Sequence, residues 1–159
     1  MSYKKVLVAY YSRTGNTRCV AQKIKETIGC DIEEIIDKEN RKGIIGFLKS
    51  GYQALKGIPA EIEENSKEVS QYDLVVIGTP VWAGRVSCAV RRYIIKNKDK
   101  FKNLAYFSTQ MGTNEDRVFE DMEELCGRKP LYKVRFTNKQ IKNGEYAEKI
   151  KKLHEILFS

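Results

Sequence analysis

Strand-like runs and helical repeats alternate five times along this chain, and this alternation restricts the possible folds more than any other feature of the sequence. Unbroken apolar runs that end at turn residues are typical of strands covered on both faces of a parallel sheet. Helical repeats between such strands predict an α/β fold with helices on both faces of that sheet. The strand-like runs are Val6–Tyr11, Asp31–Ile36, Leu74–Ile77, Leu104–Phe107 and Leu131–Phe136.

The polarity of these runs predicts the order of the strands. Asp31–Ile36 and Leu131–Phe136 are more polar than the other three, which is typical of strands at the edges of a sheet. With right-handed crossovers, the order 2-1-3-4-5 places both at the edges, giving a doubly wound, five-stranded parallel sheet. Ligands bind such a sheet beyond the carboxyl ends of the strands, at the switch point between strands 1 and 3. We therefore expect function in the segments that follow Tyr11, Ile77 and Phe107.

Apolar residues recur at helical spacing after four of the five runs, which predicts the covering helices. The connection between residues 37 and 72 is long for an α/β loop and contains a further repeat at Ile44, Leu48, Tyr52 and Leu55. The favoured interpretation is an amphipathic helix that covers the sheet, and the alternative is a lid over the ligand-binding edge. The four repeats that follow the first, third, fourth and fifth strand-like runs are Val20, Ala21, Ile24 and Ile28; Val86, Val90 and Tyr93 or Ile94; Val118, Phe119, Met122 and Leu125; and Tyr146, Ile150, Leu153 and Leu157.

Length and composition limit the possible contexts of the protein. A chain of 159 residues suffices for one domain with its own core, so we expect a single domain over residues 1–159. No apolar run approaches the roughly 20 residues that a membrane-spanning helix needs, and no signal-peptide pattern is present, so we expect a cytoplasmic protein without a membrane partner. Lys and Arg number 29 against 21 Asp and Glu, and this net charge of +8 favours acidic partners. The cysteines lack metal-binding or redox spacing, which predicts reduced, buried thiols and no metal site; they are Cys19, Cys30, Cys88 and Cys126.

The segment Ser12-Arg-Thr-Gly-Asn-Thr17 lies between an apolar strand and an amphipathic helix. Hydroxyl and amide side chains, a glycine and a helix N-terminus together meet the requirements for holding a phosphate. The segment lacks the Gly-Lys-Ser/Thr of nucleotide hydrolases and the GxGxxG of dinucleotide-binding proteins, which favours a single terminal phosphate. The alternative is that these side chains only cap the helix.

Two further segments are predicted to bind the rest of the ligand. Gly78-Thr-Pro-Val-Trp-Ala-Gly-Arg85 contains the only tryptophan of the chain, placed after a strand where its indole could stack on a flat ring. Ser108-Thr-Gln-Met-Gly-Thr-Asn114 again offers backbone amides, a glycine and small polar groups, with Met111 interpreted as a packing residue.

These motifs together resemble the flavodoxin family, whose members bind flavin mononucleotide (FMN) without a covalent bond. The resemblance covers the whole chain and includes the helix of the long connection, Gly46 to Tyr52. It implies FMN as the cofactor and a flavodoxin-like three-layer sandwich as the fold. Arg13 and Arg85, which stand inside the flavin segments, would neutralise the phosphate or favour the reduced, anionic flavin. The phosphate would be held by Ser12, Thr14, Gly15, Asn16 and Thr17, and the flavin would be lined by Pro80, Val81, Trp82, Ala83, Gly84, Ser108, Thr109, Gln110 and Gly112.

No residue has the context of an acid–base catalyst, and the sole histidine, His154, is interpreted as a surface residue. The leading hypothesis is an FMN-binding electron-transfer flavoprotein of flavodoxin type, whose redox partners present an acidic docking surface. The alternative is an FMN-dependent oxidoreductase acting on NAD(P)H and quinone, which the basic segments and the possible lid favour. A nucleic-acid role would use the positive charge, but neither basic stretch carries a binding motif and residues 115–124 are acidic, so we expect none.

Overall fold

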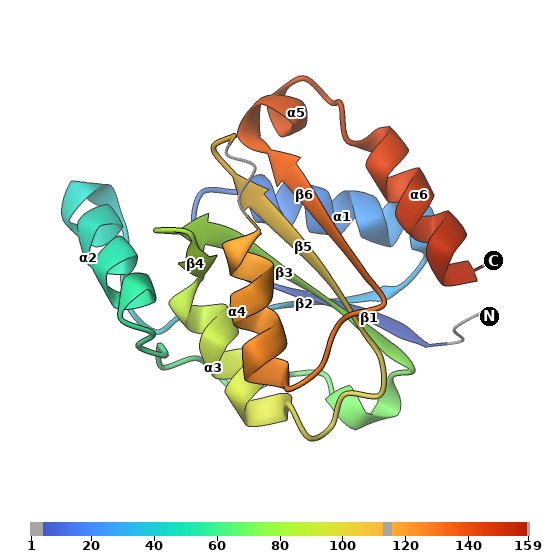
Figure 1. Cartoon of the computed structure of the whole chain (residues 1–159), viewed down its shortest axis with the longest axis horizontal. Helices are drawn as coiled ribbons and strands as arrows, with labels where there is room; N and C mark the ends of the chain where they lie inside the picture. Colours follow the sequence, from blue (N-terminus) through green and yellow to red (C-terminus); the bar gives the residue numbers. More distant parts are fainter. Residues whose placement is uncertain (1–4, 113–115, 159) are drawn as a thin grey trace.

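A parallel sheet forms the centre of the molecule, and helices lie on both of its faces (Figure 1). This computed structural model describes residues 5–112 and 116–158. The strands run in the order β2-β1-β3-β5-β6, and a short strand, β4, pairs with β3 in the antiparallel sense. Since β5 and β6 are the fourth and fifth parallel strands along the chain, the predicted order and fold class are confirmed. The strands are β1 (Val6–Tyr10), β2 (Asp31–Glu34), β3 (Leu74–Trp82), β4 (Arg85–Val86), β5 (Leu104–Gln110) and β6 (Tyr132–Thr137).

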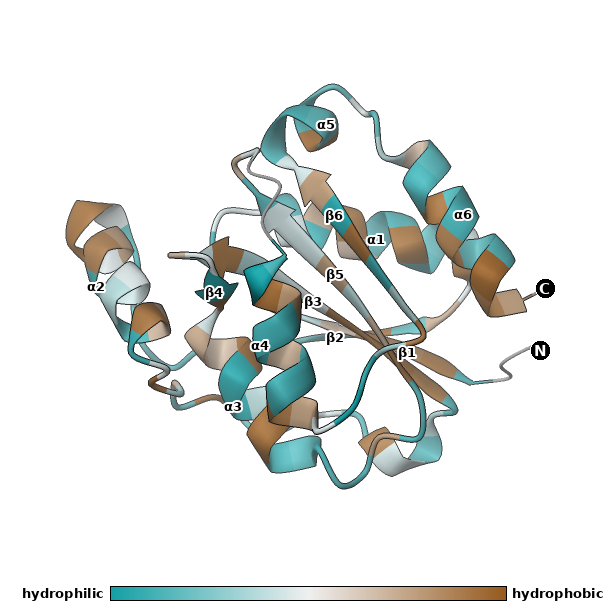
Figure 2. Cartoon of the chain, in the orientation of Figure 1, coloured by the Kyte–Doolittle hydropathy of each residue, from teal (hydrophilic) through white to brown (hydrophobic). Residues whose placement is uncertain are grey.

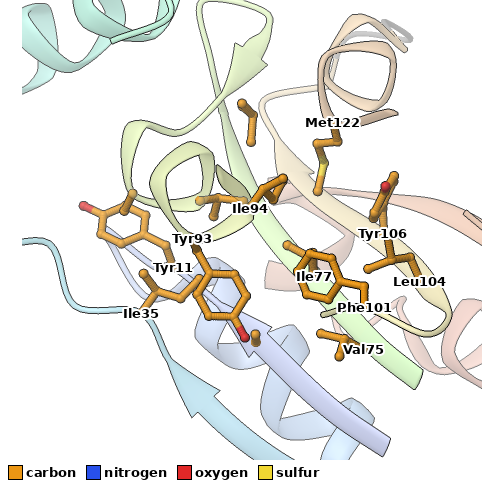
Figure 3. Packing of buried hydrophobic residues seen from close by; sticks show 14 of the residues in the cluster. Tyr11, Ile35, Val75, Ile77, Tyr93, Ile94, Phe101, Leu104, Tyr106 and Met122 are labelled. Carbon is orange, nitrogen blue, oxygen red and sulfur yellow. The ribbon is translucent and has the colours of Figure 1, made fainter. Parts of the chain in front are cut away.

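Two helices pack on each face of the sheet. One hydrophobic cluster joins the sheet to α3 and α4, and part of it is drawn in Figure 3. A second cluster joins the opposite face to α1 and α6, so the core has two layers separated by the sheet. The helices are α1 (Asn16–Ile28), α2 (Gly43–Leu55), α3 (Cys88–Asn97), α4 (Arg117–Cys126), α5 (Asn138–Lys142) and α6 (Ala147–Phe158), with a 3₁₀ helix at Val69–Gln71.

The unbroken apolar run of β1 follows from this three-layer arrangement. Leu7 and Ala9 point into the first cluster, whereas Val6 and Val8 point into the second. Successive side chains of a strand face opposite ways, so a central strand needs apolar residues at every position. The edge strand β2 buries only Glu33, and its other three residues are exposed or partly exposed. This exposure agrees with the edge position that its polar sequence predicted.

Helix α2 does not cover the sheet, so the favoured interpretation of the long connection is wrong. The predicted apolar repeat is exposed, from 49% for Leu55 to 79% for Ile44. The buried positions of α2 are the small residues Gly46, Ser50 and Ala54. Both faces of the sheet are already occupied by the other helices, and α2 stands at one end of the molecule, near the hairpin formed by β3 and β4 (Figure 1).

The expectations for the cysteines and for His154 have different outcomes. All four cysteines are free, but only Cys88 is buried, because the other three lie at the partly exposed margins of the core. His154 is exposed, as predicted. Within residues 5–112 and 116–158, no cluster of potential metal ligands is found. Across the same residues, no helix combines the length and apolar character required to traverse a bilayer.

Candidate cofactor site

Three segments from distant parts of the chain meet at the carboxyl end of the sheet. Strands β1, β3 and β5 are parallel neighbours, so the segments after them open on the same edge. The β3–β5 register pairs Thr79 with Ser108 and Pro80 with Thr109. The structure thus brings together the three segments in which the sequence predicted ligand binding. Thr113 and Asn114, at the end of the third predicted segment, lie outside the described residues.

The first segment exposes the N-terminus of α1. Gly15 adopts a left-handed conformation (φ 107°), and its N–H donates a hydrogen bond to Ser12 Oγ at 3.1 Å. Helix α1 begins at the next residue, and Gly15 supplies no side-chain cap. Backbone N–H groups at an uncapped helix start, with the positive end of the helix dipole, are suited to an anionic ligand. The interpretation of the segment as a mere cap therefore does not fit, because the helix start has no side-chain cap.

A buried hydrogen bond joins the first segment to the third. The hydroxyl groups of Thr17 and Thr109 lie 2.8 Å apart, and both residues are buried. Ser108, also buried, donates to Gln110 Oε1 at 3.1 Å. Buried hydroxyl groups are stable only when they are paired, so these contacts fix the floor of the site.

The second segment is a β-hairpin, where the sequence predicted a loop. Strand β3 continues to Trp82, and Val81 pairs with Val86 across a two-residue turn. Both turn residues have positive φ, 51° at Ala83 and 77° at Gly84, as two-residue hairpins of this kind require. The third segment is likewise more regular than predicted, because β5 includes Ser108 to Gln110. Proline and glycine in these stretches suggested loops, but pairing with neighbouring strands extends the sheet.

Trp82 is half-buried and held by contacts on two sides. Tyr11 meets its ring edge-to-face at a centroid distance of 5.5 Å. The guanidinium of Arg41 lies 5.3 Å from the centre of the indole. Burial raises the pKa of Tyr11 to about 12, so its hydroxyl stays neutral beside the indole. These contacts orient the indole at the rim of the site.

Arg41 is a residue of the site that the sequence did not reveal. It is 5% exposed and pairs with Asp37 at 2.5 Å. It also donates to Ser50 Oγ at 3.1 Å and to Gln53 Oε1 at 2.9 Å, which ties α2 to the indole. A Cβ on Gly46 would lie 2.3 Å from the Arg41 backbone, so glycine is needed for this approach. Asp37 is only four positions away, but the contacts with Ser50 and Gln53 connect residues farther apart in the chain, so no local pattern marks them.

The two arginines of the flavin segments have different surroundings. Arg13 lines the site, but its Nε donates to the carbonyl of Arg41 at 2.9 Å and one terminal nitrogen donates to the carbonyl of Gly43 at 3.1 Å. Arg85 turns away to Asp121 of α4, at 2.8 Å, and Arg91 pairs with the same carboxylate at 2.6 Å. Burial alone would raise the pKa of Asp121, but its hydrogen bonds from Arg85 and Val86 and the charge of Arg91 lower the pKa below its ordinary value.

Two adjoining cavities occupy the space between these segments. The smaller, of about 190 Å³, lies against Thr14, Asn16 and Thr17. The larger, of about 450 Å³, lies between α2 and the hairpin and is mostly apolar. The residues that line both cavities are Arg13, Phe47, Val81, Trp82 and Met111.

Most of the predicted site residues line one of these cavities. Those that do are Arg13, Thr14, Asn16, Thr17, Pro80, Val81, Trp82, Ala83, Thr109 and Gln110. Ser12 and Gly15 shape the turn before α1, Ser108 holds Gln110, and Gly84 and Gly112 line neither cavity.

The cavity walls also contain residues that the sequence did not assign to the site. They include Asn138 and, from α2, Phe47, Leu48, Tyr52 and Leu55. A lid over the ligand-binding edge, the alternative interpretation of this helix, would place these α2 residues at the site. Met111 is 88% exposed, so its interpretation as a packing residue is wrong; it projects beside the cavities because the chain leaves the sheet at Gln110.

Two family models match the chain, and each covers more than half of it. A flavodoxin domain model matches residues 53–149, and a model of NADPH-dependent FMN reductases matches residues 5–94. A search of curated proteins gave no match.

Solved structures share the fold over nearly the whole chain. A flavoprotein from Lactobacillus acidophilus NCFM, in complex with FMN, is 25% identical with a TM-score of 0.74, over 88% of this chain and 97% of that one. The two-electron reduced flavodoxin of Megasphaera elsdenii is 17% identical with a TM-score of 0.60, over 96% and 97%. The similarity to the Megasphaera elsdenii flavodoxin shows a shared fold. The two family models identify the family. By its matched domains and its three-layer architecture, the chain belongs to the flavodoxin-like family of FMN-binding proteins.

Proposed function

We propose that this protein is an electron-transfer flavoprotein that holds FMN across the two adjoining cavities. The observation that carries the proposal is their division of chemistry along one continuous surface. Hydroxyl groups and an uncapped helix start surround one end, and apolar side chains surround the other. A ligand with a phosphate at one end and a flat aromatic ring at the other matches this arrangement.

At the polar end, the residues present fit a phosphate. The N–H groups of the first turn of α1 would donate to its oxygens, and the side chains of Thr14 and Asn16 lie on the same wall. Ser12 supports this binding indirectly, because its hydroxyl accepts a hydrogen bond from the Gly15 N–H and stabilises the turn before α1. The Thr17–Thr109 hydrogen bond then fixes the distance between the phosphate end and the third segment.

At the apolar end, the residues present fit the isoalloxazine ring. Val81, Trp82 and Ala83 form one wall, and Phe47 and Met111 belong to the same cavity. Removal of water by these side chains strengthens every remaining electrostatic interaction with the ring. The contacts of Trp82 with Tyr11 and Arg41 hold the indole in place before the cofactor binds.

When bound, FMN supplies the redox chemistry, and the protein supplies binding, orientation and exclusion of water. Among the described residues, no His, Cys, Asp, Glu or Lys lines either cavity. A proton that accompanies an electron therefore has to come from solvent or be held by backbone and hydroxyl groups of the site. This supports a carrier more than an enzyme with its own general acid or base.

Titration of the apoprotein with FMN tests the proposal directly. Binding through both ends should quench the fluorescence of FMN at micromolar protein concentrations, and the recombinant protein should be yellow. Riboflavin, which lacks the phosphate, should bind more weakly because it loses the contacts at the start of α1. Absence of quenching, or equal affinity for FMN and riboflavin, would refute the proposed division of the site.

A second candidate function is an FMN-dependent oxidoreductase that uses NAD(P)H and reduces quinones. Two observations favour it: the larger cavity of about 450 Å³ is bounded by α2, which leaves space beside a ring, and the FMN reductase model matches residues 5–94. Steady-state oxidation of NADPH with a quinone, compared with the radical yield during gradual photoreduction, separates the two functions. Rapid turnover without a radical favours the oxidoreductase, and a stable radical with slow turnover favours the carrier.

A further inference from the structure

Helix α2 presents an apolar surface to solvent, which neither the fold nor the cofactor site requires in full. We call this surface the α2 face; it consists of Ile44, Ile45, Phe47, Leu48, Tyr52 and Leu55. Its most exposed members, Ile44 (79%) and Ile45 (83%), line neither cofactor cavity. Figure 2 shows brown segments on α2, separated by white and pale teal ones, at the outer end of the molecule. Phe47, Leu48, Tyr52 and Leu55 also line the larger cavity, so bound FMN would cover part of the α2 face and leave Ile44 and Ile45 exposed. Adjacent large apolar side chains at a surface mark a site of interaction.

The α2 face is held outward by the packing of the opposite side of the helix. Gly46, Ser50 and Ala54 form the buried side, and Gly46 admits the backbone of Arg41. The buried guanidinium of Arg41 bonds to Ser50 and to Gln53 of the same helix. Rotating α2 to bury its large side chains would break these bonds and leave a buried charge unpaired, so the exposed orientation is the stable one.

The charges around the α2 face are cationic. Lys42 precedes the helix, Lys56 follows it, and neither forms an ion pair with any of the described residues. Lys49 projects from the helix itself and pairs with Glu39. Asp37 is paired with Arg41, and Glu34, which lines the same pocket as Lys42, is paired with Arg18. The apolar surface is therefore bordered by positive charge that the protein itself does not neutralise.

We propose that the α2 face docks on an anionic lipid bilayer, with the helix lying in the interface. Large aliphatic side chains with lysines at both ends are the features of helices that bind at lipid interfaces, and the net charge of +8 adds attraction to anionic headgroups. A second copy fits less well, because pairing two α2 faces would bring the lysines of both copies together. This proposal departs from the expectation of no membrane partner, which rested on the lack of a run long enough to cross a bilayer. Docking at the interface needs no spanning helix, and no described helix is suited to span.

Sedimentation with lipid vesicles tests this inference, using the full chain loaded with FMN. We expect binding to phosphatidylcholine vesicles that contain about 30% phosphatidylglycerol, and much weaker binding to pure phosphatidylcholine. Raising the salt from about 0.05 M to about 0.5 M should weaken binding severalfold, because the Debye length shortens. Ile45→Glu should reduce the partition coefficient about tenfold or more, since a charge replaces buried apolar surface.

Matched variants separate docking from folding. Ile156→Glu changes an isoleucine of α6 that is 39% exposed and should leave vesicle binding unchanged. Lys42→Gln combined with Lys56→Gln should lower binding to anionic vesicles and leave the affinity for FMN unchanged. The inference is overturned if neutral and anionic vesicles bind equally, if no vesicle binds, or if Ile45→Glu has no effect. It is also overturned if gel filtration shows a dimer that Ile45→Glu dissociates, because a second copy would then cover the surface. Ile45, Lys42 and Lys56 line neither cofactor cavity, so these variants test vesicle binding separately from FMN binding.

Discussion

Asp121→Asn tests how the hairpin of the cofactor site is held to the rest of the protein. The Asp121 side chain is 4% exposed and pairs with Arg85 at 2.8 Å and with Arg91 at 2.6 Å. It also accepts the backbone N–H of Val86, in β4, at 3.1 Å. One carboxylate therefore connects α4, α3 and the hairpin.

The cost of the substitution falls mainly on Arg91. The side chain of Arg85 is 20% exposed and can turn to solvent, but that of Arg91 is 7% exposed and cannot. Breaking a buried ion pair by removing one partner costs about 3–5 kcal/mol. The asparagine oxygen can still accept one hydrogen bond, so we expect a loss of about 3 kcal/mol. For a chain of this size, that corresponds to a fall in melting temperature of roughly 6–12 °C.

The pH dependence gives a sharper test than the magnitude. Because the pKa of Asp121 is lowered in the folded state, its contribution to stability is present above the unfolded pKa of about 3.9. The contribution is lost as the pH falls through the folded pKa. Urea denaturation should therefore show a large difference between wild type and variant at pH 7, which shrinks as the pH drops below about 4. Glu120→Gln, an exposed change on the same helix, is the control. A difference that is absent at pH 7, or constant with pH, would refute the reasoning.

Three further predictions concern the cofactor and its partner. Trp82→Ala should weaken FMN binding by about 1–3 kcal/mol in a fluorescence titration, and Trp82→Phe by less, because stacking and apolar contact are lost in part; equal affinity in all three proteins would show that the indole does not contact the ring. Gly15→Ala places a side chain at φ 107° and should lower both stability and FMN affinity, by about 1–3 kcal/mol in thermal and binding measurements. Electron transfer to an acidic redox protein, followed by stopped-flow, should slow between low and physiological salt as the screening length falls to about 8 Å; a rate indifferent to salt would remove the electrostatic argument for the partner.

The sequence predicted the parts of the fold that depend on residues close together in the chain. Apolar runs such as Val6–Tyr11 require cover on two faces, and the polar character of Asp31–Ile36 requires an edge, so the strand order followed. The phosphate-binding expectation for Ser12–Thr17 has the same origin, since a strand, a glycine turn and a helix start are consecutive. In each case, the feature is encoded by periodicity or by neighbouring residues.

Only the tertiary structure decided what lies around the flavin end of the site. The stretch from Gly78 to Trp82 has the composition of a loop, yet it forms a strand because β5 and β4 are available to pair with it. A Cβ on Gly78 would lie 2.0 Å from the ring of Phe107, so this close approach depends on a residue of another strand. The apolar repeat of α2 was visible in the sequence, but the sequence did not show whether this side of the helix faces the sheet or solvent. Its large side chains face solvent because its small ones, together with Arg41, satisfy buried contacts that no local pattern records. The chain therefore encodes its elements locally, whereas the walls of the cofactor site arise from contacts between residues distant in the sequence.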